Sequence, residues 1–217
     1  MQSGKQELIN AWYNKDKLLE QQRENSDEID KNDVTFSQST EEMGQKIYPT
    51  MYGCQCFSTH AMIYNQPVHV NLWSRSLQEN SEKEHVPQTV GSLHSIINGS
   101  HLCFGICCLK LNSSSDDWTE DYQLSLHQGI HEIHGLHPTV QIGVLLTYPS
   151  SWNLSKEKQS QMKDRIYSFL PSSIQETIHS VSFVSQEKQI QYFQTLVQWI
   201  LSIYQQRREL ISKKIDK

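Results

Sequence analysis

Hydrophobic and polar positions divide the chain into a polar N-terminal part and a longer part in which strands and helices alternate. Residues 5–22 are predicted to form a first helix, because their apolar side chains recur at nearly helical spacing: Leu8, Ile9, Trp12, Leu18 and Leu19. Residues 23–47 are polar and acid-rich, with almost no apolar position. This composition predicts a mobile acidic loop.

The pattern changes to strands after residue 48. Residues 54–64 and 67–73 alternate apolar and polar side chains, which predicts a hairpin that turns around Asn65-Gln66 and ends at Trp73. Residues 102–111, LCFGICCLKL, are almost continuously apolar. Such a run is typical of a strand that is buried on both faces.

Helices and strands alternate through the rest of the chain. Residues 113–117 offer N-cap side chains for a helix that runs to about His134, and residues 140–146 predict a second buried strand. Ser155 caps a helix that Pro171 ends, after Phe169. The last two elements are a short strand at residues 180–184 and a long amphipathic helix at residues 186–211.

Buried strands that alternate with helices predict the α/β class. We expect a mostly parallel sheet with helices on both faces, and the hairpin of residues 54–73 as its antiparallel edge. In such a sheet ligands bind at the carboxyl ends of the strands.

Charge and composition argue against some classes of function. A net charge of -5 argues against nucleic-acid binding, which needs a concentrated positive surface. The start of the chain lacks a signal-peptide pattern, and no apolar run approaches the roughly 18 residues of a membrane span. We expect a cytoplasmic protein whose five cysteines are reduced.

Three short stretches carry a family resemblance: Tyr48-Pro49-Thr50, Leu72-Trp73 and Gln78-Glu79. In their order and spacing the chain resembles the Ras-superfamily small GTPases of Rab type, and residues 137–142, HPTVQI, are similar to the Rag branch. The resemblance implies a P-loop G domain that is degenerate and shortened at its N-terminus. Residues 1–22 would then hold a P-loop remnant, and residues 48–217 the remainder of a single G-like domain.

The P-loop remnant is Ser3-Gly4-Lys5-Gln6. The resemblance assigns phosphate contacts to Gly4 and Lys5, but Gln6 replaces the hydroxyl residue that binds magnesium. The strand that precedes a P-loop is absent, and it would be the central strand of the family's sheet. Either the chain is a shortened product, or a segment such as residues 33–37 fills the gap.

The switch regions depart from the family pattern. Thr50 occupies the position of the magnesium-binding threonine, and Gln78 matches the glutamine that positions water. Ser74 and Leu77 stand where the family has aspartate and glycine. Gln78 would therefore be a relic of the catalytic residue.

Base recognition is altered as well. Thr147 fits the first position of the [NT]KxD loop, but Ser150 cannot supply the carboxylate that selects guanine. The loop of residues 185–187 matches the family's SAK loop only loosely. We therefore expect no cofactor.

A histidine series follows the helix predicted after residue 113, at His127, His131, His134 and His137. A pair of histidines four residues apart is a known zinc-ligand spacing. The alternatives are a pH-sensitive partner surface and a polar edge beside the apolar stripe, of which we favour the polar edge.

These observations predict a small-GTPase-like protein that has lost nucleotide hydrolysis and acts as a protein-interaction, scaffold or regulatory subunit. Its partners would bind a switch-like surface formed by Thr50, Trp73, Arg75, Leu77 and Gln78. One alternative is an atypical small GTPase that still binds GTP or GDP with magnesium, and another is an unrelated α/β binding module. The chain end, KKIDK, lacks the cysteines that a prenyl anchor requires.

Overall fold

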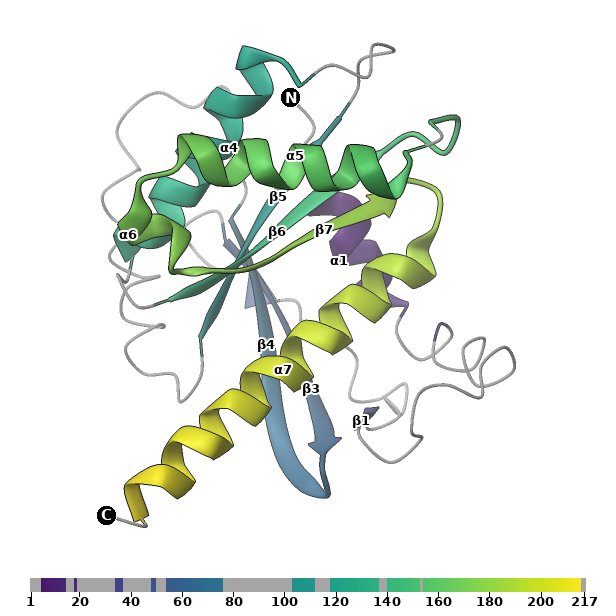
Figure 1. The fold of residues 1–217 in the computed structure, drawn as a ribbon. Coiled ribbons are helices and arrows are strands. Elements are labelled where there is room, and N and C mark those ends of the chain that lie inside the picture. Colours follow the sequence, from purple (N-terminus) through teal and green to yellow (C-terminus); the bar gives the residue numbers. More distant parts are fainter. Residues whose placement is uncertain are drawn as a thin grey trace. The chain divides into compact units, whose positions relative to one another are not determined.

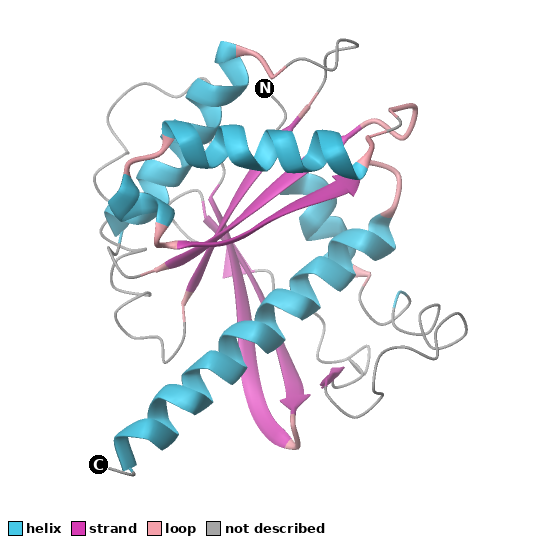
Figure 2. Ribbon diagram, in the orientation of Figure 1, coloured by secondary structure: helices cyan, strands magenta, loops and turns pink. Residues whose placement is uncertain are grey.

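The structure is a computed structural model (Figures 1 and 2). It describes residues 5–14, 18, 34–36, 48–49, 54–75, 103–111, 118–136, 140–152 and 154–215. The chain divides into two compact units, which are described separately below. Unit 1 comprises Met1–Leu18 and Gly99–Trp199, and unit 2 comprises Leu19–Asn98 and Ile200–Lys217. The predicted divisions at residues 22 and 47 stay predictions.

Unit 1 is built on a three-stranded parallel sheet in the order β5-β6-β7, which confirms the α/β class. The strands are β5 (Phe104–Lys110), β6 (Gln141–Tyr148) and β7 (Ile178–Ser185). The middle strand, β6, is buried from Ile142 to Thr147. A parallel strand needs cover on both faces, and this explains its continuous apolar sequence.

Two helices cover one face of this sheet, α4 (Glu120–Leu136) and α5 (Lys156–Phe169), and Figure 1 shows α5 lying across the strands. Leu126 and Ile130 of α4 share one hydrophobic cluster with Ile166 of α5 and the inward side chains of the strands. On the other face, Gly143 of β6 lies against Trp199 of α7 (Gln189–Ile215). Helices therefore lie on both faces of this sheet, as predicted.

The local signals place both ends of α5 correctly, whereas α7 begins three residues and ends four residues later than predicted. Ser155 is the N-cap of α5, where its hydroxyl accepts a hydrogen bond from the Lys158 backbone N–H at 3.3 Å. The predicted cap of α4 in residues 113–117 lies outside the described residues. Thr119 accepts a hydrogen bond from the Tyr122 N–H at the start of this helix. The short helix α6 (Ser172–Gln175) is an addition that the sequence did not predict.

Unit 2 contains an antiparallel sheet around the predicted hairpin of β3 (Cys54–Ile63) and β4 (Gln66–Arg75). The turn consists of Tyr64 and Asn65, which both have positive φ angles, of 47° and 60°. This backbone suits the twist of a two-residue hairpin. The turn therefore lies one residue earlier than predicted.

The last part of α7 also belongs to unit 2. There Tyr204 stacks on Tyr64 at the hairpin turn, with ring centroids 6.3 Å apart. The Arg208 guanidinium lies 5.8 Å from the centroid of the same Tyr64 ring. Both contacts cover the first residue of the turn.

Strand β4 continues through Arg75, so the predicted strand end at Trp73 was wrong. Ser74 pairs with Gln55 and Arg75 pairs with Cys54, which extends the ladder to the first residue of β3. The physical reason is that β3 offers backbone partners over its whole length. A polar Ser-Arg pair at the end of a strand is compatible with this pairing.

The predicted sheet is confirmed only in part, as the parallel sheet of unit 1. Within the described residues, the hairpin belongs to a separate antiparallel sheet with β1 (Val34–Phe36) and β2 (Tyr48–Pro49). Strand β1 lies inside the segment predicted to be a loop, and it pairs antiparallel with β3. It therefore does not serve as the central strand of the parallel sheet.

Candidate functional site

The structure describes only some of the residues that the sequence nominated. Gly4, Thr50, Leu77 and Gln78 lie outside the described residues. Lys5 is the first residue of α1 (Lys5–Tyr13), and Thr147 lies near the end of β6, both in unit 1. In unit 2, Trp73 pairs with Cys56 and Arg75 with Cys54.

Thr147 is enclosed by protein at the carboxyl edge of the parallel sheet. Its side chain is 0% exposed, and so is that of Tyr192 on α7. Burial raises the pKa of the Tyr192 phenol, and the negative charge of Glu7 adds to the increase, whereas the Thr147 hydroxyl opposes it. Neither hydroxyl has a hydrogen-bond partner with good geometry among the described residues. Thr147 therefore packs against α7 and does not present its hydroxyl to an open edge.

Backbone hydrogen bonds tie the three strand ends together. The Leu111 N–H donates to the Thr147 carbonyl at 2.8 Å, and the Gln186 N–H donates to the Tyr148 carbonyl at the same distance. The Gln186 side-chain amide donates to the Leu111 carbonyl at 3.3 Å. Ser185, which matches the SAK loop, is buried beside these bonds. The backbone groups at this edge are thus bonded within the protein, whereas the Ser185 hydroxyl is buried without a partner among the described residues.

Charged side chains of α1 lie against the same end of β5. The Lys110 ammonium is 3.5 Å from a Glu7 carboxylate oxygen, and both side chains are partly exposed. Ion pairs of this kind contribute at most about 1 kcal/mol. The positive charge of Lys110 is therefore paired with a carboxylate of the same chain.

The cysteines of β5 are poor nucleophiles. Burial raises the pKa of Cys107 to about 12, and the negative charge of Glu132 adds to this effect. Burial also raises the pKa of Cys108, where the Lys5 ammonium opposes the shift. The thiolate is the reactive form of cysteine, so these two side chains are suited to packing.

Two described histidines of the series, His127 and His131, lie in contact. The rings of His127 and His131 are 4.3 Å apart at an interplanar angle of 53°, and His131 is exposed. His137 lies outside the described residues. Among the residues with assigned positions, no group of three or more His, Cys, Asp or Glu side chains could hold a metal ion.

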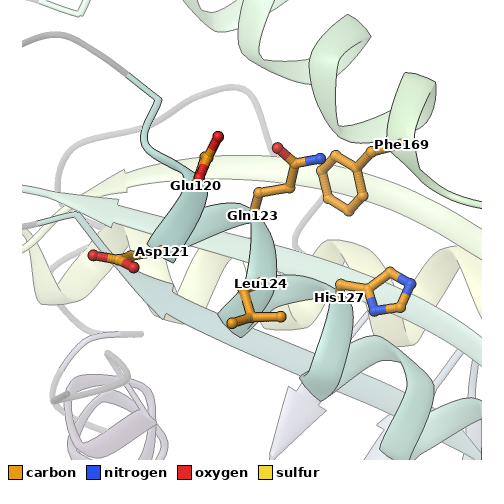
Figure 3. Close-up of a pocket in the computed structure, with 6 residues that line it drawn as sticks. All are labelled: Glu120, Asp121, Gln123, Leu124, His127 and Phe169. Atoms are coloured by element: carbon orange, nitrogen blue, oxygen red, sulfur yellow. The ribbon is translucent and has the colours of Figure 1, made fainter.

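A hollow lies between α4 and the end of α5, and sequence reasoning did not find it. Its volume is about 560 Å³, and we call it the α4–α5 hollow. Figure 3 shows the six described residues that line it: Glu120, Asp121, Gln123, Leu124 and His127 of α4, and Phe169 of α5. Leu124 is 67% exposed, whereas Leu126, two residues further along, is fully buried.

Phe169 and His127, which line the hollow, belong to a series of aromatic contacts that continues into the core. The Phe169 ring lies 6.3 Å from the His127 ring and 6.5 Å from the Trp118 ring, and Trp118 in turn lies 6.1 Å from Tyr122. The sequence did contain one signal for this site. Leu124 is out of phase with the apolar stripe of α4, and a leucine on the polar face of a helix can mark a contact surface.

Comparisons with known proteins leave the chain without an assigned family. No family model matches it, and no curated protein or solved structure does so either. None of the helices in the described part of the chain is both long and apolar enough to span a membrane. The fold class is α/β, and any proposal about function has to be argued from the residues of this chain.

Proposed function

We propose that this chain is a protein-interaction or regulatory subunit, built on a small-GTPase-like P-loop fold that has lost nucleotide hydrolysis. The order of elements from β5 to α7 supports this proposal, because strands and helices alternate there as in the G domain that the sequence resembles. The parallel sheet of unit 1 has helices on both faces, which is also compatible with that fold.

The observation that carries the proposal is the burial of Thr147. A base-recognition loop must present its polar side chains to a ligand at the carboxyl ends of the strands. Here Thr147 and Tyr192 are both fully buried, and the Gln186 side-chain amide donates a hydrogen bond to the Leu111 carbonyl. A nucleotide base at this edge would have to displace these side chains.

The altered switch residues support the same function. Ser74 replaces the aspartate expected for magnesium, and in the structure it is part of the β3–β4 ladder. Ser150 replaces the guanine-selecting carboxylate and is exposed in the turn after β6. The partner surface predicted around Thr50, Trp73, Arg75 and Leu77 stays a prediction, since the side chains of these residues lie outside the described part.

Purified protein, denatured and analysed by ion-exchange chromatography, should release less than about 0.05 mol of GDP or GTP per mol of chain. The physical reason is that tight nucleotide binding requires magnesium and phosphate ligands, of which this chain keeps too few. A matched preparation of Lys5→Ala should give the same background. Stoichiometric nucleotide that is lost in Lys5→Ala would instead support the atypical GTPase and contradict the proposal.

A further inference from the structure

Beyond the predicted switch-like surface, the α4–α5 hollow is an open depression on the surface of unit 1. Its volume of about 560 Å³ is comparable to that of ligand pockets, and five of its six lining residues come from a single exposed helix face and its flank. The sixth, Phe169, closes it from the end of α5 (Figure 3). The hollow is thus an open depression along one side of α4, with Phe169 at one end.

Leu124 and Phe169 supply its apolar part. Leu124 is one of two large hydrophobic side chains that are exposed in the described residues, and Phe169 is half-buried. The Phe169 ring is held by Trp118, which stacks on it at an interplanar angle of 24°. An aromatic ring beside an exposed leucine offers apolar area that a partner can cover.

Glu120 and Asp121 supply its charge. Both are exposed in the first turn of α4, and within the described residues neither forms an ion pair. None of the described lining residues is a lysine or an arginine. The chain as a whole carries a net charge of -5, which has the same sign as the two carboxylates that line the hollow. Charge complementarity therefore selects a basic partner.

The spacing of these groups along α4 limits the geometry of the partner. Leu124 follows Glu120 by four residues, and His127 follows Leu124 by three. The three side chains therefore lie along one side of the helix. A partner helix that packs along this side would bring its own side chains into register at the same spacing. It needs a cation opposite the carboxylates and a large apolar side chain one turn away.

We propose that the α4–α5 hollow is the docking site for a segment of a partner protein that carries a lysine or arginine three or four residues from a large apolar side chain. This inference rests on the proposed function as a protein-binding domain. It adds a second surface to that function and names the chemistry of the partner. A second copy of this chain is the competing occupant.

A display library of random 16-residue peptides, selected on the full chain, tests the proposal. Selected peptides should be enriched in lysine or arginine three or four positions from leucine, phenylalanine or tryptophan. In fluorescence polarisation, Leu124→Asp should weaken their binding by about tenfold, because it removes the apolar contact. Glu120→Lys and Asp121→Lys should each weaken it by about fivefold, and added salt should weaken the wild type.

Glu187→Lys is the matched control, since Glu187 is exposed in unit 1 and does not line the hollow. This variant should bind like the wild type. Selected peptides without basic residues, or equal binding by Leu124→Asp, would overturn the proposal. Self-association of the wild type that Leu124→Asp abolishes would replace the partner with a second copy. Stoichiometric bound nucleotide would contradict the proposed function and leave the peptide result unchanged, so the two failures are distinguishable.

Discussion

Gly143→Val is expected to lower the free energy of unfolding of unit 1 by about 3 kcal/mol, the upper end for overpacking a core. A Cβ at this position would lie 2.8 Å from the Phe104 ring and 2.9 Å from the Trp199 ring. Both contacts are closer than side-chain atoms tolerate, and the two rings already pack against each other with centroids 5.5 Å apart. Neither ring can move without opening the face of the sheet that α7 covers.

Urea unfolding followed by tryptophan fluorescence measures this effect. Gly135→Ala is the matched control, because a Cβ at Gly135 meets no atom within 4 Å and alanine favours a helix. This control should unfold at the same or a slightly higher urea concentration. If Gly143→Val unfolded together with the control, the close packing of β6 against α7 would be wrong.

Leu126→Ala is expected to lower the free energy of unfolding by about 3 kcal/mol, the usual cost of removing a buried leucine side chain. Leu126 is fully buried in the cluster that α4 and α5 form over the sheet. The loss combines the apolar area that is no longer buried with the cavity that remains.

The same substitution two residues earlier separates stability from function. Leu124→Ala should change the free energy of unfolding by less than about 0.5 kcal/mol, because its side chain is 67% exposed. It should nevertheless weaken the binding of the selected peptides. Thermal or urea denaturation of the two variants side by side provides the comparison. Equal losses of stability would show that the face of α4 has been assigned incorrectly.

Much of unit 1 could be predicted from sequence because its signals are local. Ser155 caps α5 at the predicted residue, and the continuous apolar run of residues 140–146 forms the buried strand β6. These elements depend on side-chain periodicity and capping, which a single sequence displays. The helix α7 likewise follows from its long apolar stripe.

The pairing of strands was harder to predict, since it depends on contacts between distant segments. Strand β1 has only three residues and lies in a polar segment, so its pairing with β3 left no local pattern. The end of β4 at Arg75 was missed for the same reason, because the partner residues in β3 decide where the ladder stops.

The candidate site was predictable only in part. Sequence reasoning nominated Thr147 from a loop resemblance, but it could not foresee that this side chain is fully buried and interacts with Tyr192, 45 positions further along. The hollow was missed because sequence reasoning used Phe169 only to mark the end of a helix and did not consider Leu124. A site formed by two helices requires their relative placement, which periodicity does not provide.

Titration of the purified chain with a fluorescent guanine nucleotide in the presence of magnesium tests the central claim most directly. We expect no saturable change in fluorescence up to about 100 μM protein, a concentration at which an affinity of roughly -5.5 kcal/mol or tighter would be visible. The reason is that protein side chains fill the carboxyl edge at Thr147. Saturable, magnesium-dependent binding at one nucleotide per chain would contradict the account.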